Sequence, residues 1–235
     1  MMFVRRALFA TLFTLSALVL SVSICAAFWL PSIVSVHMSR AWGWSVLAIC
    51  RLFGIRYKVE GELPKSLSRG GFIIASKHQS PWEIAALHYL FFPAVFMFKR
   101  ELLYIPLAGF AMLKEGSMPV DRGSTTRVGL LKLIGKFKEK LKTRNVAVFP
   151  EGTRTLPGAA PAYKSGIGTI AAGLGSAAII PVAHNSGRIW PRRGYPSFGG
   201  LITLRVMPVI NTKGLGRNEI NKRLEAAVEK GMRGL

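Results

Sequence analysis

The 235-residue chain carries 32 lysines and arginines against 11 acidic residues, a formal net charge of +21, and half of its residues are hydrophobic. So large a positive charge requires an anionic partner, and because none of the usual nucleic-acid motifs appears, the composition favours a membrane surface with anionic lipids over nucleic acid. The two cysteines, Cys25 and Cys50, lie in apolar stretches, so neither a disulfide framework nor a metal site is predicted.

Residues 1–55 are predicted to form a membrane-embedded helical segment. After Arg5 and Arg6, residues 7–30 contain no charge, and a helix needs about 20 apolar residues to cross a bilayer. A cleaved signal peptide is the alternative, because small residues occur at 23–27, near the end of the apolar run.

A second apolar stretch covers residues 41–55. It contains Trp42 and Trp44 and is interrupted by Arg51, which favours a re-entrant or interfacial segment over a second span, with an ordinary core helix as the alternative. Basic residues flank both apolar stretches, so the positive-inside rule does not favour a simple crossing. A hairpin or shallow insertion with both ends in the cytoplasm reconciles these charges.

From residue 56 onward, short strand-like runs alternate with helical ones, which is typical of an α/β domain. We therefore predict a single mixed-sheet domain over residues 56–235, flanked by helices. The predicted strands cover 56–59, 71–76, 94–98, 117–120, 145–149, 177–182 and 201–208. The predicted helices cover 82–92, 105–113, 126–142, 166–173 and 218–230.

A histidine stands where the predicted strand 71–76 gives way to a helix. His78 would lie just outside the helix N-terminus, where the helix dipole keeps its ring neutral, as a general base requires. Glu83 is near enough to accept a hydrogen bond from one ring nitrogen while the other takes a proton. The alternative is that Glu83 only completes a capping box, with Ser80 as the cap and Pro81 at the first helical position.

Polar groups also follow other predicted strands, where α/β sheets usually bind ligands. Arg122 follows the strand 117–120 after one intervening residue and offers a planar, charged fork suited to phosphate oxygens, with a surface pair to Asp121 as the alternative. Residues 180–185 end another apolar strand, and here we expect packing, with Asn185 as a turn residue.

The segment Phe-Pro-Glu-Gly-Thr-Arg-Thr at 149–155 follows the strand 145–149. Gly152 lets the backbone approach a ligand closely, Thr153 supplies a hydroxyl, and Arg154 adds a second phosphate fork. A plain turn tolerates the same residues, but Glu151, if buried at the strand end, would need a partner. His37 and His88 have no carboxylate at matching spacing and are expected to be structural.

Taken in this order, the four stretches resemble the four sequence blocks of the glycerolipid acyltransferase family, which includes bacterial 1-acylglycerol-3-phosphate acyltransferases. Histidine-x4-acid and Phe-Pro-Glu-Gly-Thr-Arg together are specific to it, and the resemblance spans roughly residues 76–185. It implies transfer of a fatty acyl group from acyl-CoA or acyl carrier protein to a lysophospholipid hydroxyl. The acceptor would be 1-acylglycerol-3-phosphate, giving phosphatidic acid in phospholipid biosynthesis. The enzyme would sit at the bacterial inner membrane, with its active site facing the cytoplasm.

The resemblance also implies a role for each site residue. His78 and Glu83 would be catalytic, while Arg122 and the run Glu151, Gly152, Thr153 and Arg154 would bind the acceptor. No metal or cofactor is expected beyond the acyl donor as co-substrate, and no nucleic acid as partner. No Ser or Cys nucleophile accompanies the histidine, so direct transfer without an acyl-enzyme is predicted.

Three positions depart from the family pattern. Glu83 stands where the family usually has Asp, residues 118–120 (Met-Pro-Val) stand where many members carry a bulky Phe-Ile pair, and Thr155 replaces the commoner Ser. The first two leave other acceptors open: glycerol-3-phosphate, a lyso-aminolipid or a lipid A precursor. Outside the enzyme class, the alternative is a non-catalytic protein that binds anionic membranes.

Overall fold

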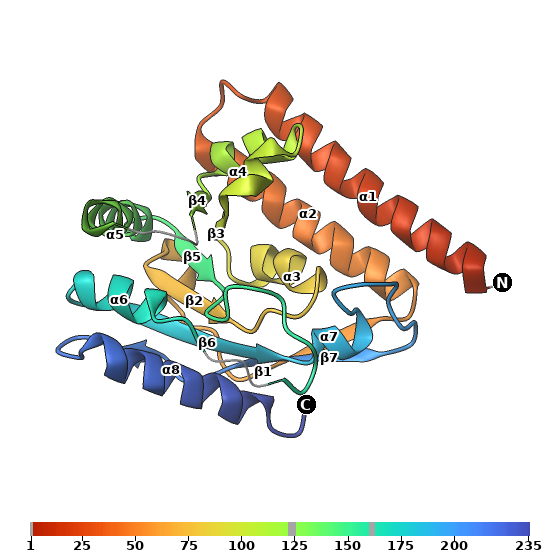
Figure 1. The fold of residues 1–235 in the computed structure, drawn as a ribbon. Coiled ribbons are helices and arrows are strands. Elements are labelled where there is room, and N and C mark those ends of the chain that lie inside the picture. Colours follow the sequence, from red (N-terminus) through yellow and green to blue (C-terminus); the bar gives the residue numbers. More distant parts are fainter. Residues whose placement is uncertain (1, 122–125, 160–162) are drawn as a thin grey trace.

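The computed structural model of the chain describes residues 2–121, 126–159 and 163–235 (Figure 1). Two helices, α1 (Met2–Ala26) and α2 (Ser32–Leu52), come first. The strands that follow are β1 (Arg56–Glu60), β2 (Phe72–Ser76), β3 (Ala94–Lys99), β4 (Met118–Val120), β5 (Asn145–Val148), β6 (Ala178–His184), β7 (Leu201–Val206) and β8 (Ile210–Asn211). The helices between and after them are α3 (Trp82–Leu90), α4 (Ala108–Glu115), α5 (Arg127–Leu141), α6 (Gly166–Gly173), α7 (Ser186–Ile189) and α8 (Arg217–Met232), with 3-10 turns η1 (Leu67–Arg69) and η2 (Arg100–Tyr104).

The strands form one mixed sheet in the order β1-β7-β6-β2-β5-β3-β4, with β8 paired to β6. The neighbours along this order run parallel except β6 and β7, which are antiparallel, as are β6 and β8. Ile74 in the central strand β2 lies opposite Ala147 of β5 and Ile180 of β6. The carboxyl ends of β2, β5 and β6 therefore meet at one edge of the sheet.

Helices cover both faces of the sheet, because successive strand side chains point to opposite faces (Figure 1). Ile74 is buried in a cluster that contains residues of α2 and α3. Its neighbours Ile73 and Ala75 are buried in a second cluster, with residues of α5, α6 and α8. The predicted fold, a mixed α/β sheet flanked by helices, is confirmed.

The predicted strands match β1 to β7 closely, and the main difference among the helices concerns α4. The structure places η2 before this helix, and α4 begins at Ala108 rather than at residue 105. Leu107 has a φ of 62°, which is incompatible with a right-handed helix, so the helix starts directly after it. The short elements β8 and α7 were not among the predicted ones.

The N-terminal helices pack on the domain to different extents. Helix α2 lies directly on α3: a Cβ added to Gly43 would come within 2.4 Å of the carbonyl oxygen of Ala85. The second apolar stretch thus belongs to a helix that begins earlier, at Ser32, and packs one face as a core helix while Trp44 is exposed. The predicted division at residues 55 and 56 stays a prediction.

Helix α1 is far more exposed than α2. It is 25 residues long and strongly apolar, and only 11% of its most apolar stretch is buried in the protein. Within the described part of the chain, it is the one helix with the length and composition needed to cross a bilayer. The buried ring of Phe9 fixes its first half against Trp190, with ring centroids 4.9 Å apart.

Candidate active site

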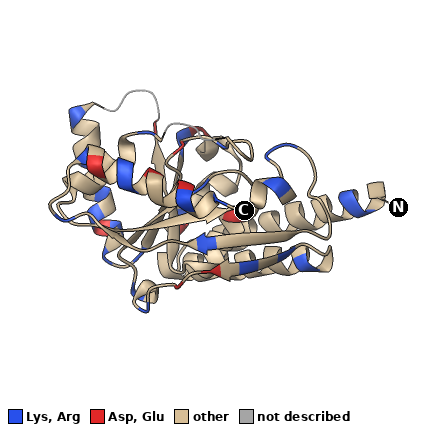
Figure 2. Ribbon diagram, turned by 90° about the horizontal axis from the view of Figure 1, so that it is seen from below, with Lys and Arg blue, Asp and Glu red and all other residues tan. Residues whose placement is uncertain are grey.

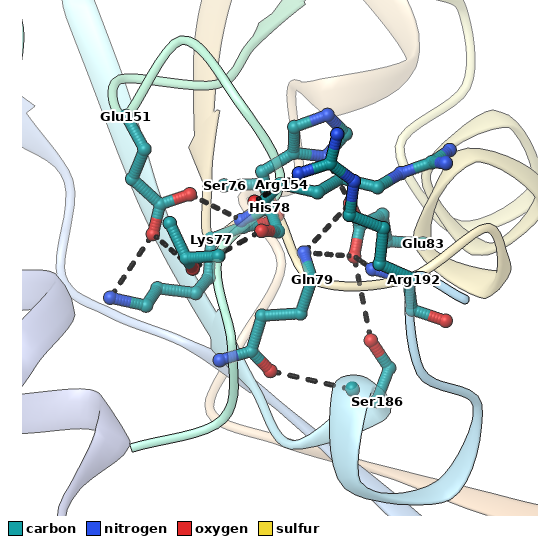
Figure 3. A network of polar contacts seen from close by, with 12 residues as sticks. Ser76, Lys77, His78, Gln79, Glu83, Glu151, Arg154, Ser186 and Arg192 are labelled. Atoms are coloured by element: carbon teal, nitrogen blue, oxygen red, sulfur yellow. Dashed lines mark hydrogen bonds and ion pairs between the residues drawn. The ribbon is translucent and has the colours of Figure 1, made fainter. Parts of the chain in front are cut away.

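Four segments from different parts of the sequence form a polar network at the carboxyl edge of the sheet (Figure 3). His78 follows β2, and Glu83 lies in the first turn of α3. The loop after β5 supplies Glu151 and Arg154, and the end of β6 leads through His184 to Ser186 at the start of α7. This convergence follows from the parallel pairing of β2, β5 and β6.

The ring of His78 is held on several sides. Its Nδ1 makes a hydrogen bond with Glu83 Oε1, and the ring stacks on Phe149, with centroids 3.9 Å apart and an interplanar angle of 17°. The backbone N–H of His78 donates to Glu151 Oε2 at 2.8 Å, and its carbonyl accepts from the N–H of Thr155 at 2.8 Å. The side chain is 13% exposed and lines the cavity described below.

The carboxylate of Glu83 is both a capping group and the partner of His78. Its Oε2 accepts from the backbone N–H groups of Gln79 at 3.0 Å and Ser80 at 2.9 Å, while Oε1 faces His78. Ser80 Oγ accepts from the N–H of Trp82, where α3 begins as predicted, and Pro81 occupies the cap position rather than the first helical position. The two roles considered for Glu83 therefore coexist in one side chain.

Burial is the dominant influence on the ionisation of Glu83. The fully buried carboxyl has its pKa raised to about 7 by desolvation, and His184 together with the two backbone N–H donors acts in the opposite direction. Both N–H groups require an acceptor, so they favour the ionised form that can stabilise an imidazolium.

His184 and Ser186 belong to this network, although the sequence predicted only packing for residues 180–185. His184 Nε2 donates to the carbonyl of Lys77 at 2.9 Å and lies 3.4 Å from Glu83 Oε2. Because a carbonyl only accepts, Nε2 carries the proton, and Nδ1 accepts from Ser186 Oγ at 2.9 Å. Burial lowers the pKa of His184, which keeps its ring neutral. The side-chain oxygen of Asn185 accepts a hydrogen bond from the backbone N–H of Thr203 at 2.9 Å.

The buried Glu151 does have a charged partner, as its predicted position required. Lys77, 1% exposed, places its Nζ 3.1 Å from Glu151 Oε1 and 2.8 Å from Glu229 Oε1 in α8. Desolvation raises the pKa of Glu151 to about 7, and Lys77 lowers it. Glu151 does not line the cavity described next. Its substrate-binding role stays a prediction, and its contacts favour a role in positioning His78.

A cavity of about 520 Å³ opens beside His78. The side chains near its polar end are His78, Thr153, Arg154 and Arg192, and apolar residues of α1, α2, α4 and β3 line much of the remainder. This volume lies within the usual range for small-molecule sites, and its apolar lining suits a fatty chain. His88, predicted to be structural, is buried and also lines this cavity, whereas His37 packs on Phe92.

The predicted phosphate-binding residues differ in how the structure places them. Thr153 and Arg154 line the cavity. Gly152 lies outside that lining and has a φ of 71°, which favours glycine in the turn. Arg122 falls outside the described residues, and Asp121 pairs with Arg100 at 2.9 Å. Over the described ranges, no group of three or more His, Cys, Asp or Glu side chains is arranged to hold a metal ion.

Comparison with known proteins gives consistent matches. Residues 56–185 match the family model described as Acyltransferase. The 1-acyl-sn-glycerol-3-phosphate acyltransferase of Pseudomonas aeruginosa is 36% identical over 183 residues, which cover 76% of this chain and 70% of that protein. The Escherichia coli protein of the same name is 28% identical over 179 residues, with 73% and 69% covered.

A solved structure extends the comparison to the whole fold. The crystal structure of the 1-acyl-sn-glycerophosphate acyltransferase PlsC from Thermotoga maritima matches with a TM-score of 0.72 and 24% sequence identity, covering 99% of this chain and 96% of that one. At this identity the structural match establishes the shared fold. The family model covers more than half of the chain and the Pseudomonas relative shares over a third of the aligned residues, so the chain belongs to the acyltransferase family.

Proposed function

We propose that this acyltransferase moves a fatty acyl group from acyl-CoA or acyl carrier protein to the hydroxyl of 1-acylglycerol-3-phosphate, which yields phosphatidic acid for phospholipid biosynthesis. The observation that carries the proposal is the His78–Glu83 pair at the polar end of an apolar cavity that also exposes Arg154. The names of the Pseudomonas and Escherichia relatives support the choice of acceptor.

In the proposed reaction His78 is the general base. Its Nε2 takes the proton from the acceptor hydroxyl as that oxygen attacks the thioester carbonyl, and Glu83 stabilises the imidazolium. The new C–O ester bond forms, the C–S bond breaks, and the imidazolium returns its proton to the departing thiolate. The acyl group passes directly to the acceptor, with the donor as the only co-substrate.

The acceptor phosphate would lie against the guanidinium of Arg154, with Thr153 and Arg122 contributing further donors. Arginine suits this role because its fork matches two phosphate oxygens at once. The apolar part of the cavity would take a fatty chain, since its walls come largely from α1, α2, α4 and β3. We further propose that α1 is embedded in a bacterial inner membrane and that the site faces the cytoplasm.

The test is an acyl-transfer assay with the full chain in lipid vesicles. Labelled acyl-CoA and acyl carrier protein would be offered with 1-acylglycerol-3-phosphate, glycerol-3-phosphate, a lyso-aminolipid and a lipid A precursor. We expect the highest kcat/KM with 1-acylglycerol-3-phosphate. Faster transfer to another acceptor would identify that acceptor as the substrate in place of 1-acylglycerol-3-phosphate. No transfer to any acceptor would favour a non-catalytic protein that only binds membranes.

A further inference from the structure

Two arginines from distant segments meet at the polar end of the cavity. Arg154 lies in the loop after β5, and Arg192 lies in the loop between α7 and β7. Both line the cavity together with His78, and the Nη1 of Arg192 reaches the backbone carbonyl of Arg154 at 3.4 Å. Figure 3 draws both side chains beside the His78–Glu83 pair.

These two arginines differ from other arginines of the protein in their counter-charges. Arg100, Arg205 and Arg223 each form an ion pair with a carboxylate. Within the part of the chain that the structure describes, Arg154 and Arg192 form none, and the buried Nε of Arg154 has no hydrogen-bond partner.

The charges around Arg154 and Arg192 favour the binding of an anion. Glu83 attracts Arg154, but its oxygens already accept hydrogen bonds from His78, Gln79 and Ser80. Burial lowers the pKa of Arg154, and the neighbouring charge of Arg192 lowers it further. Both effects are costs to the folded protein that a bound anion would offset.

Resting on the proposed function, we infer that Arg192 is a second phosphate-binding guanidinium and that the Arg154–Arg192 pair selects acceptors with a phosphate monoester over those with a phosphodiester. A monoester carries close to two negative charges at neutral pH and three terminal oxygens. A phosphodiester has one charge and two free oxygens, so it satisfies only one fork well. Arg192 also lies beyond the four sequence blocks, which end at residue 185.

The experiment compares two neighbouring arginines. Arg193 is exposed like Arg192 but does not line the cavity, so Arg193→Ala is a control matched in charge and in position. With the full chain in vesicles and saturating acyl donor, kinetics would be measured with 1-acylglycerol-3-phosphate and with its methyl phosphodiester. We expect Arg192→Ala to raise the KM for the monoester roughly tenfold or more, the size of a lost charge-assisted pair.

The remaining expectations separate binding from loop support. Arg192→Ala should leave the KM for the donor within about twofold, and it should lower the preference for monoester over diester, while Arg193→Ala changes neither quantity. The inference is overturned if both variants behave alike, or if Arg192→Ala weakens the two acceptors equally, as loss of the bond to the Arg154 carbonyl alone would do.

A second measurement keeps this inference apart from the proposed function. Calorimetric titration of a short-chain, water-soluble 1-acylglycerol-3-phosphate into wild type and Arg192→Ala requires no chemistry. Binding that weakens in the variant supports a phosphate contact even if the assay shows no transfer. Equal affinities overturn that contact even if transfer is fast.

Discussion

At the scale of single residues, the proposed reaction depends on one imidazole. His78 lines the cavity, and its ring and backbone are fixed by Glu83, Phe149, Glu151 and Thr155. A general base contributes about 10² to 10⁴-fold to a rate, so His78→Ala should lower turnover by at least about 100-fold. The exposed His37 provides the control, because His37→Ala should leave turnover and vesicle binding unchanged. Near-normal acyl transfer by His78→Ala would contradict the proposed mechanism.

The double role of Glu83 leads to a second prediction. Glutamine at this position can still accept from the backbone N–H groups of Gln79 and Ser80, so Glu83→Gln should change the free energy of unfolding by about 1 kcal/mol or less, the scale of a helix cap. It cannot stabilise an imidazolium, so turnover should fall at least tenfold. Glu83→Asp, the acid usual in the family, should be milder. Denaturation curves and initial rates measured together check this, and a fully active Glu83→Gln would reduce Glu83 to a cap.

At the scale of elements, the sheet was predictable from sequence, while several of its connections were not. Strands such as 71–76 and 145–149 are long apolar runs bounded by turn residues, and each run is a local signal. The strand β8 and the helix α7 contain two and four residues, too few to show any periodicity.

The same limit applies to the site. His78 and Glu83 lie five positions apart, so their pairing was visible in the sequence. Lys77 finds Glu229 at a separation of 152 positions, and Arg192 meets Arg154 across 38. No sequence pattern around Lys77 or Arg192 identifies the residue that it contacts. Each pair is brought together only when the sheet folds. Ser186 was not predicted as a site residue for the same reason, since its contact with Glu83 spans 103 positions.

Lys77 links helix α8 to the loop after β5, and this link carries a third prediction. Lys77→Met would leave the carboxylate of Glu151 buried without its cation, so the free energy of unfolding should fall by roughly 3–5 kcal/mol. Lys142 is the control: its pair with Glu139 is exposed, and Lys142→Met should cost less than about 1 kcal/mol. Chemical denaturation in detergent measures both.

The dependence on pH provides a further check on the same variant. The pKa of Glu151 is raised to about 7 in the folded protein, so the folded state holds this proton more tightly than the unfolded chain, where the value is near 4.5. Without Lys77 that pKa should rise further. The deficit of Lys77→Met should therefore be largest above the raised pKa of the variant, shrink as the pH falls from there to about 7, and stay constant at lower pH, where Glu151 is protonated in both proteins. A deficit that does not vary with pH would contradict this account.

At the scale of the whole molecule, most basic side chains lie outside the apolar helix α1. Lysines and arginines are spread over the outer helices and loops (Figure 2), and α5 exposes Lys132, Lys136 and Lys138 beside Val128 and Leu131. Helix α1, in contrast, exposes apolar side chains along its length. Insertion through α1 and attraction through the basic surface would thus be two separable ways of binding a bilayer.

A matched pair of double variants distinguishes insertion through α1 from attraction through the basic surface. Leu15→Glu with Leu18→Glu changes the exposed side of α1, and Val128→Glu with Leu131→Glu makes the same change of charge on α5. A carboxylate at the centre of a membrane helix costs about 2.5–3.5 kcal/mol, so the α1 variant should leave vesicles in high salt, where charge attraction is screened. The α5 variant should float with them. If the α5 variant is the one released, α5 rather than α1 inserts.

Because α1 forms part of the cavity wall, its position relative to the bilayer would determine which measure of acceptor concentration controls the reaction rate. Ala17, Leu20, Ser21 and Ile24 of this exposed apolar helix border the space beside His78. With α1 in the bilayer, a lipid acceptor would enter sideways from the leaflet, and a product with two fatty chains would leave by the same route. The rate would then follow the mole fraction of acceptor among the surrounding lipids rather than its amount per volume of water. Adding inert phospholipid at constant total acceptor would slow the enzyme by dilution in two dimensions.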